Sequence, residues 1–225
     1  MKFTEIEGLF ESATIKPTFE YIHIILALYL FEKEKGGIGR YRLKEELLIG
    51  SGTARSLIEK LNEKINFITV LSEKNKKKGH VLTKAGQAFL NKLKAKIPLL
   101  EEGDLSVLKE ILIESENLAS YYCLIKNSAS KLTTGIKQRD AAIKIDGFGA
   151  TCLSFNGSKF KFPLKAFSEH EMEQMEISEN VQEYFRSNIA SMNVQLDRND
   201  VIIIGLGESP EKARLAAMNA ALTLI

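Results

Sequence analysis

The chain has 225 residues, 44% of them hydrophobic and 27% charged, with only four prolines; this composition fits a soluble globular protein of one or two domains and excludes long disordered segments. Residues 1–100 contain 18 Lys and Arg against 11 Asp and Glu, a net charge of +7, whereas residues 101–225 contain 13 against 18, a net charge of −5. This asymmetry is expected when one domain meets a polyanion and the other does not, although lysines that merely solubilise the surface would also produce it.

The N-terminal residues and the apolar runs of the chain indicate a cytoplasmic protein without a membrane partner. Residues 1–5 show no apolar signal region. The longest apolar run, residues 19–31, is interrupted by Glu20 and His23 and is too short to span a bilayer.

The first strong helical pattern runs from Thr18 to about Lys35. Its apolar residues recur three or four positions apart on more than one side, which predicts a buried helix that ends at Gly36-Gly37. His23 lies inside this pattern. We interpret it as a core or boundary residue, because no Cys or His stands at metal-ligand spacing, and we expect no metal site.

Two shorter helical patterns follow, over 43–48 and about 53–64, joined by a turn at 50–52 in which Ser51 is a plausible N-cap. The spacing of the second pattern predicts an inner face of Ala54, Leu57, Ile58 and Leu61. It leaves an outer face of Thr53, Arg55, Ser56, Glu59 and Lys60. Small and polar residues with an arginine suit insertion into the major groove of DNA, but any solvated helix would show a similar set.

A basic hairpin comes next. Alternating patterns predict strands over 67–71 and 79–82, with the segment 73–78 and its three consecutive lysines at the tip. Lysines at a tip favour phosphate contact, and solvated tip lysines are the alternative reading. A Leu-Thr-x-x-Gly close at 82–86 leads into a helix over 87–96.

Helix, turn, helix and basic hairpin together indicate a winged helix-turn-helix that contacts double-stranded DNA. The second helix would read base edges, while two arginines before it and the hairpin lysines would contact the backbone. The predicted DNA-binding residues are Arg40, Arg42, Ser51, Thr53, Arg55, Ser56, Lys60, Lys74, Lys76, Lys77, Lys78 and His80.

The C-terminal half has a different pattern. A linker with a short helix is expected over 98–117, because Pro98 cannot continue the preceding helix. Strands are expected over 118–126, 148–155, 159–162 and 200–206, and helices over 135–143, 168–192 and 210–222. The predicted fold class is α+β, an N-terminal winged helix-turn-helix over 1–97 followed by an effector-binding or dimerisation domain over 118–225, with a small sheet covered by helices on one face.

Chemistry-bearing motifs are sparse in this half. A small-ligand site is predicted at Lys137, Arg139, Asp140, Gly205, Gly207 and Ser209, since a glycine loop before a helix can receive an anion. An ordinary strand-to-helix turn, and an ion pair or dimer contact for Arg139-Asp140, are the alternatives. Cys123 and Cys152 are expected to be reduced core residues, with a disulfide as the less favoured alternative. No catalytic residues and no cofactor are predicted, because no nucleophile–base, metal or nucleotide motif occurs.

Three stretches resemble one known family: GGIGRYRLKEELLIGSGTARSLIEKL at 36–61, GIKQRDAAIKIDGFGATCL at 135–153 and DVIIIGLG at 200–207. The family is an archaeal group of winged-helix proteins with an uncharacterised C-terminal domain. The resemblance implies a transcriptional regulator whose C-terminal domain is similar to the α+β GAD-type domain of some tRNA-charging enzymes. It implies no particular ligand.

Three functions follow as hypotheses. The first is a DNA-binding transcriptional regulator, a homodimer on a two-fold site whose C-terminal half supplies the dimer contact, a pocket for a small-molecule effector, or both. The second is an RNA-associated or protein-docking module linked to translation. The third is an enzyme that acts on a small anion near Arg139 and residues 205–209.

Overall fold

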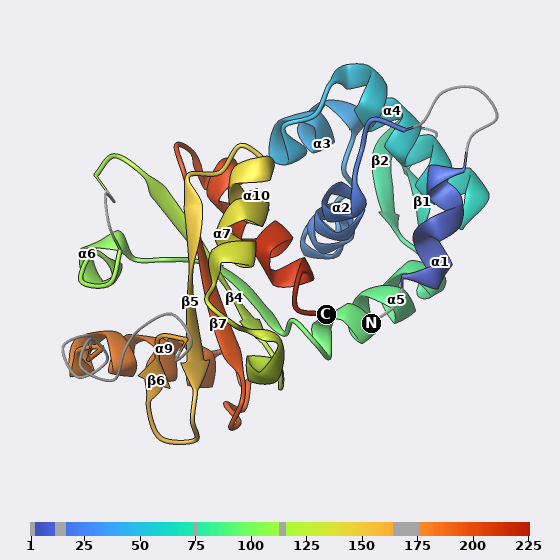
Figure 1. The fold of residues 1–225 in the computed structure, drawn as a ribbon. Helices are drawn as coiled ribbons and strands as arrows, with labels where there is room; N and C mark the ends of the chain where they lie inside the picture. The colour runs from blue at the N-terminus through green and yellow to red at the C-terminus, as the bar shows by residue number, and fades with distance from the viewer. Residues whose placement is uncertain (1–2, 12–16, 74–75, 113–115, 164–175) are drawn as a thin grey trace. The chain divides into compact units, whose positions relative to one another are not determined.

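The computed structural model describes residues 3–11, 17–73, 76–112, 116–163 and 176–225 (Figure 1). The chain divides into two compact units, Met1–Leu93 and Lys94–Ile225, hereafter the N-terminal and C-terminal units. Helices and sheets occur in both, so the predicted α+β class is confirmed.

The N-terminal unit contains helices and a two-stranded sheet (Figure 1). Its elements are α1 (Thr4–Glu7), the short 3-10 helix η1 (Gly8–Phe10), α2 (Tyr21–Lys33), α3 (Arg40–Leu47), α4 (Ser51–Glu59), the π-helical turn η2 (Lys60–Lys64), β1 (Ile68–Glu73), β2 (Lys76–Leu82) and α5 (Lys84–Lys94). Helix α2 is the core of this unit, because nine of its thirteen residues are buried. The predicted burial on more than one side is confirmed.

His23 is a buried polar residue of α2, only 7% exposed, as the sequence predicted for a core histidine. Its Nδ1 accepts a hydrogen bond from the Glu20 backbone N–H at 2.9 Å and closes a capping box at the start of the helix. Burial lowers the pKa of His23 below its usual 6.5, against the opposing effect of the nearby Glu20 carboxylate. The folded protein therefore holds a neutral imidazole near neutral pH.

This buried imidazole predicts a loss of stability in mild acid. Below pH 6.5 the unfolded chain binds a proton at His23 that the folded chain resists, so stability falls as pH drops through this range. We expect the unfolding free energy to decrease between pH 7.5 and 5.5, with His23 contributing to this decrease. Urea titrations at both pH values should show a smaller decrease for His23→Gln, which keeps an acceptor but does not titrate. Equal decreases in the wild-type and His23→Gln proteins would contradict the assignment of this pH dependence to His23.

The hairpin differs from its predicted form. Lys76, Lys77 and Lys78 belong to strand β2 and do not form the tip, whereas Lys74 lies outside the described residues. The ladder pairs Leu71 with Gly79 and Ser72 with Lys77, so Lys78 is the extra residue of a bulge. The strands therefore extend further than the alternating pattern indicated.

A third segment joins this hairpin. The backbone of Ile38 exchanges two hydrogen bonds with that of His80, both 2.9 Å long. Gly79 permits this approach: its φ is +118°, and an added Cβ would lie 2.6 Å from the Ile38 carbonyl carbon. The segment between α2 and α3 is thereby fixed to strand β2.

The turn between α3 and α4 also differs in detail. Leu48 takes the left-handed conformation with φ 53° and ends α3. Gly50 occupies the N-cap position of α4, and Ser51 is the first helical residue. The predicted N-cap role of Ser51 is therefore wrong, and the turn lies two residues earlier than 50–52.

The C-terminal unit is built on a five-stranded, fully antiparallel sheet in the order β3-β4-β7-β5-β6. Its elements are β3 (Leu99–Glu102), α6 (Leu105–Leu108), β4 (Ala119–Ile125), the 3-10 helix η3 (Ala129–Lys131), α7 (Ile136–Lys144), β5 (Gly149–Phe155), β6 (Phe160–Lys161), α9 (Glu179–Ser191), β7 (Val201–Gly207) and α10 (Pro210–Leu222). Part of the predicted linker over 98–117 is therefore edge strand β3, which pairs with β4 along its whole length. The predicted helix 168–192 begins only at Glu179 within the described residues, and 164–175 lie outside them.

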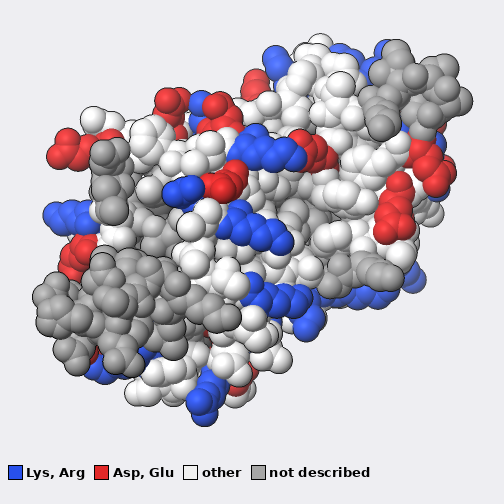
Figure 2. Space-filling view, in the orientation of Figure 1, with Lys and Arg blue, Asp and Glu red and all other residues white. Residues whose placement is uncertain are grey.

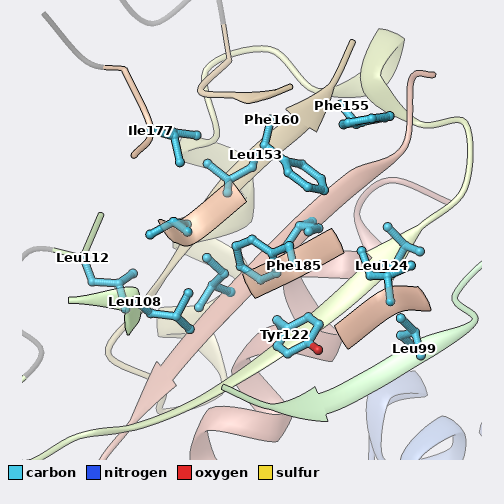
Figure 3. Close-up of a cluster of buried hydrophobic side chains, with 14 of the residues drawn as sticks. Leu99, Leu108, Leu112, Tyr122, Leu124, Leu153, Phe155, Phe160, Ile177 and Phe185 are labelled. Atoms are coloured by element: carbon cyan, nitrogen blue, oxygen red, sulfur yellow. The ribbon is translucent and has the colours of Figure 1, made fainter. Parts of the chain in front are cut away.

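Helices cover both faces of this sheet, and the prediction of helices on one face is wrong. Helices α7 and α10 pack on one face, where the small residues of α10 contact β7 and β4. Helix α9 lies on the other face, as Figure 1 shows. There Phe185 joins the cluster drawn in Figure 3, together with Tyr122 and Leu153 from the strands. Successive residues of β7 contribute to the two faces in turn.

Both cysteines are buried and free, which confirms the predicted core role. Cys123 on β4 and Cys152 on β5 both pair across the sheet with Ile203 of the central strand β7. Burial raises the pKa of Cys152 to about 12 and that of Cys123 still further above its usual range. Both thiols are therefore protonated and unreactive at neutral pH.

Candidate nucleic-acid interface

Helix α4 presents one exposed stripe to solvent. The inner face is as predicted, with Ala54, Leu57 and Ile58 of α4 and Leu61 of the following turn η2 buried. The exposed residues of α4 are Ser51, Gly52, Arg55 and Glu59. At about 100° per residue these four fall on a single side of the helix, opposite the core. The two smallest stand in the first turn, so a ligand as large as a base pair edge can approach the helix closely there.

The neighbouring side of α4 contacts the N-terminal segment of the same unit. Thr53 Oγ1 lies 2.5 Å from Thr18 Oγ1. The Lys60 ammonium donates to the Leu9 carbonyl and stands 5.7 Å from the centre of the Phe19 ring. Thr53 and Lys60 are therefore half-buried and already engaged, and Ser56 beside them is half-buried as well. Of the predicted residues of this helix, Ser51 and Arg55 are the most accessible.

Arg55 and Glu59 form an exposed ion pair along the stripe. The Arg55 Nε donates to the Glu59 carboxylate at 2.7 Å, and the two are spaced i, i+4. This hydrogen bond raises the pKa of Arg55 above its usual value, so the guanidinium is charged at all relevant pH. An exposed pair of this kind holds its partners weakly. The arginine can therefore exchange the carboxylate for an anionic ligand at small cost.

The two arginines of α3 have different surroundings. Arg42 donates to Glu34 at 2.9 Å and lies 3.5 Å from Glu46, so its charge is neutralised within the protein. Arg40 instead lies against Tyr41, with its Cζ 5.0 Å from the ring centre and a hydrogen bond of 3.2 Å to the hydroxyl. Arg42 is thus exposed but paired with carboxylates, whereas Arg40 is half-buried and lies against an aromatic ring.

Sequence reasoning missed Tyr41 as a site residue. Its side chain is 69% exposed, the highest value among the large hydrophobic residues of the described chain. The sequence pattern could have indicated an exposed ring, because Tyr41 falls between Arg40 and Arg42 and outside the apolar spacing of Leu43 and Leu47. An exposed aromatic ring beside an arginine is a surface on which a sugar or a base can pack.

Strand β2 places the remaining predicted residues in one short segment. Lys78 is exposed, and His80 is half-buried next to the Ile38 bridge. The backbones of Lys76 and Lys77 are paired to β1 opposite Glu73 and Ser72. Three lysines are therefore carried by a hydrogen-bonded strand.

Surface charge alone does not locate an interface. On the face shown in Figure 2, basic and acidic side chains are interspersed among the described residues. The site is therefore defined by the exposed stripe of α4, the Arg40–Tyr41 pair and the lysines of β2.

The predicted small-ligand residues at the end of β7 and the start of α10 serve to pack the helix against the sheet. Gly205 is buried within the strand, and an added Cβ would lie 2.2 Å from the backbone N of Ala217 in α10. Gly207 has the same role two residues further along β7. A Cβ added there would lie 2.5 Å from the backbone N of Ala213 in α10. Ser209 is the N-cap of α10, where its Oγ accepts from the Lys212 N–H at 3.3 Å. These residues bring α10 onto the sheet and do not form a loop open to an anion.

Lys137, Arg139 and Asp140 lie on the exposed side of α7. Arg139 donates to Asp140 at 2.8 Å, and both side chains remain more than half exposed, at 55% and 59%. Gly135, which precedes this helix, is its N-cap and has a left-handed φ of 80°.

Two further properties concern the part of the chain that the structure describes. It contains no group of three or more His, Cys, Asp or Glu side chains arranged to hold a metal ion. None of its helices is both long and apolar enough to cross a membrane.

Comparison with known proteins gives a family match for part of the chain and structural matches among solved proteins. Residues 117–224, most of the C-terminal unit, match a domain of unknown function, DUF4443. No protein with a curated description matches the chain. The solved structure of the hypothetical protein PH0730 from Pyrococcus horikoshii OT3 is similar over 92% of this chain and 93% of its own, with a TM-score of 0.62 and 24% identity. The two-unit chain thus shares its fold with an archaeal protein.

Proposed function

We propose that this protein is a DNA-binding transcriptional regulator, in which the N-terminal unit acts as a winged helix-turn-helix. Helix α4 would enter the major groove through Ser51, Gly52 and Arg55, and the lysines of β2 would contact the flanking phosphates. The observation that carries the proposal is the exposed stripe of α4, in the same compact unit as a hairpin strand with three consecutive lysines.

The other residues of the unit support this arrangement. The Ile38–His80 bridge fixes the hairpin to the segment before α3, so the helix pair and the strand form one compact unit. Arg40 and Tyr41 stand at the start of α3, where a helix N-terminus adds a favourable field for phosphate. Gly205, Gly207 and Ser209, which were predicted for a small ligand, have structural positions, and the proposal therefore includes no effector site at this turn.

A salt series on a fluorescent duplex tests the proposal. Fluorescence anisotropy with a random 25-base-pair duplex should give non-specific dissociation constants of roughly 10⁻⁶ to 10⁻⁴ M near physiological salt, and tighter binding at 50 mM. A double-stranded RNA of the same length is the comparison. Tighter binding to the RNA at equal salt would favour the RNA-associated alternative, and no binding of either duplex at 50 mM salt would contradict the proposal.

The ion pair on the stripe provides a gain-of-binding prediction. Glu59→Gln removes a negative charge from the proposed interface and releases Arg55 from its carboxylate partner. We expect duplex affinity at 50 mM salt to increase about three- to fivefold, equivalent to the energy of an exposed ion pair. Glu116→Gln in the C-terminal unit makes the same charge change at another exposed position and is the control. Equal increases from the two variants would show a general charge effect and no role for α4.

A further inference from the structure

Helix α4 offers one side chain that can read a base by two hydrogen bonds. Its sequence, SGTARSLIE, contains a single arginine and no lysine, asparagine or glutamine. Arginine pairs bidentately with O6 and N7 of guanine, whereas asparagine and glutamine pair with adenine. Arg55 lies on the exposed stripe, and its side chain is 68% exposed. The composition of α4 therefore favours guanine over adenine as the base that this helix recognises.

The ion pair with Glu59 orients the arginine. Glu59 accepts a hydrogen bond of 2.7 Å from Nε, the inner nitrogen of the Arg55 guanidinium, and lies one turn further along the helix. Among the described residues, the outer nitrogens Nη1 and Nη2 have no such partner. These two nitrogens can therefore donate in parallel to one ligand, which is the fork geometry that matches the guanine edge.

Small neighbours make room for a base pair beside this fork. Ser51 lies one turn before Arg55 on the same stripe, and no described atom lies within 4 Å of a Cβ built on Gly52. The Ser51 hydroxyl can donate or accept, so it adds a hydrogen bond without selecting one base. On the adjacent side of α4, Thr53 and Lys60 contact the N-terminal segment of the same unit. Base selection by this helix therefore depends chiefly on Arg55.

We propose that Arg55 contacts a guanine in the major groove and that Glu59 is the positioning residue for its guanidinium. The inference rests on the proposed DNA binding and names the class of duplex that α4 selects, namely sites with a guanine opposite Arg55. A phosphate contact by Arg55 would behave differently, because phosphates are the same in every sequence and carry no preference for a base. The two kinds of contact predict different effects of removing the arginine.

Selection from a 25-base-pair duplex library with a randomised centre, followed by sequencing, tests the contact on the full chain. Sites selected by the wild type should share one guanine. Exchange of its G·C pair for A·T should weaken wild-type binding about tenfold or more in the anisotropy assay. Arg55→Ala should bind these two duplexes within about twofold of each other, and Arg55→Gln should prefer the A·T duplex. Circular dichroism should show both variants folded, since the position is exposed and both residues favour helix.

Glu59→Gln separates positioning from removal of charge. A neutral amide holds Nε more weakly, so discrimination between the two duplexes should fall about threefold. Affinity for the random duplex should nevertheless rise, because Arg55 is released to contact phosphates. Glu45→Gln makes the same charge change at an exposed position of α3, outside the stripe, and should leave the discrimination unchanged. If Glu59→Gln also leaves it unchanged, the positioning role of Glu59 is wrong.

Failure of this inference can be distinguished from failure of the proposed function. Wild-type binding to duplex without a shared guanine in the selected sites would overturn the inference alone. The same holds if Arg55→Ala keeps the tenfold discrimination and loses affinity uniformly, with the salt slope lowered by about 0.9, since Arg55 would then contact a phosphate. Absence of binding to any duplex at 50 mM salt would contradict the proposed DNA binding itself, and the inference with it.

Discussion

Replacement of Lys76, Lys77 and Lys78 by alanine is expected to lower affinity for duplex DNA by about 10²-fold at 100 mM salt. Each lysine that neutralises a phosphate releases counterions and contributes about 0.9 to the slope of log K against log salt. Loss of three such contacts should therefore reduce this slope by up to about 2.7. The measurement is the anisotropy salt series on the random duplex, repeated with the variant.

A matched control separates local contact from overall charge. Lys109, Lys159 and Lys161 are exposed lysines of the C-terminal unit, and their replacement by alanine makes the same change in net charge. The control variant should retain the wild-type slope within about 0.5. If both triple variants lose affinity equally, the lysines of β2 have no special place in binding and the proposed hairpin contact is wrong.

Gly205→Ala is expected to destabilise the C-terminal unit by about 3 kcal/mol, at the upper end of the cost of overpacking a core. The added Cβ would lie 2.2 Å from the backbone N and 2.6 Å from the Cα of Ala217, so α10 must move away from β7. Scanning calorimetry should show the transition of this unit lowered by about 10 °C.

Gly52→Ala makes the same chemical change at a position with open space. No atom lies within 4 Å of the Cβ position there, and alanine favours helix more than glycine does. This variant should unfold at the wild-type temperature or slightly above it. A Gly205→Ala protein as stable as wild type would mean that Gly205 does not set the packing of α10, and would reopen the ligand-binding interpretation of this glycine.

Elements whose signals are local could be predicted closely from the sequence. Helix α10 begins at Pro210 and ends at Leu222, as predicted, because Ser209 caps it and proline favours the first helical turn. The buried face of α4 followed from spacing alone.

The coverage of the sheet by helices was predicted incorrectly, although a signal existed. All seven residues of β7 are buried, and a strand that is apolar throughout has both faces covered. An alternating strand would have fitted a sheet with one open face. The continuous run VIIIGLG was therefore evidence against a single helical layer.

Contacts between distant parts of the chain could not be predicted from the sequence. Lys60 contacts Leu9 and Phe19, more than forty residues away, and periodicity carries no information on such pairs. For the same reason the outer side of α4 was predicted too broadly. Tertiary contacts decide that Thr53 and Lys60 are engaged while Ser51 and Arg55 stay exposed.

The most direct test of the proposed function is an amide NMR titration of the full chain with duplex DNA. The account predicts that the signals of Ser51–Ser56 and Lys76–Lys78 shift or broaden first, and that those of the C-terminal sheet change little. Changes confined to the C-terminal unit, or no changes at 50 mM salt with excess duplex, would contradict it.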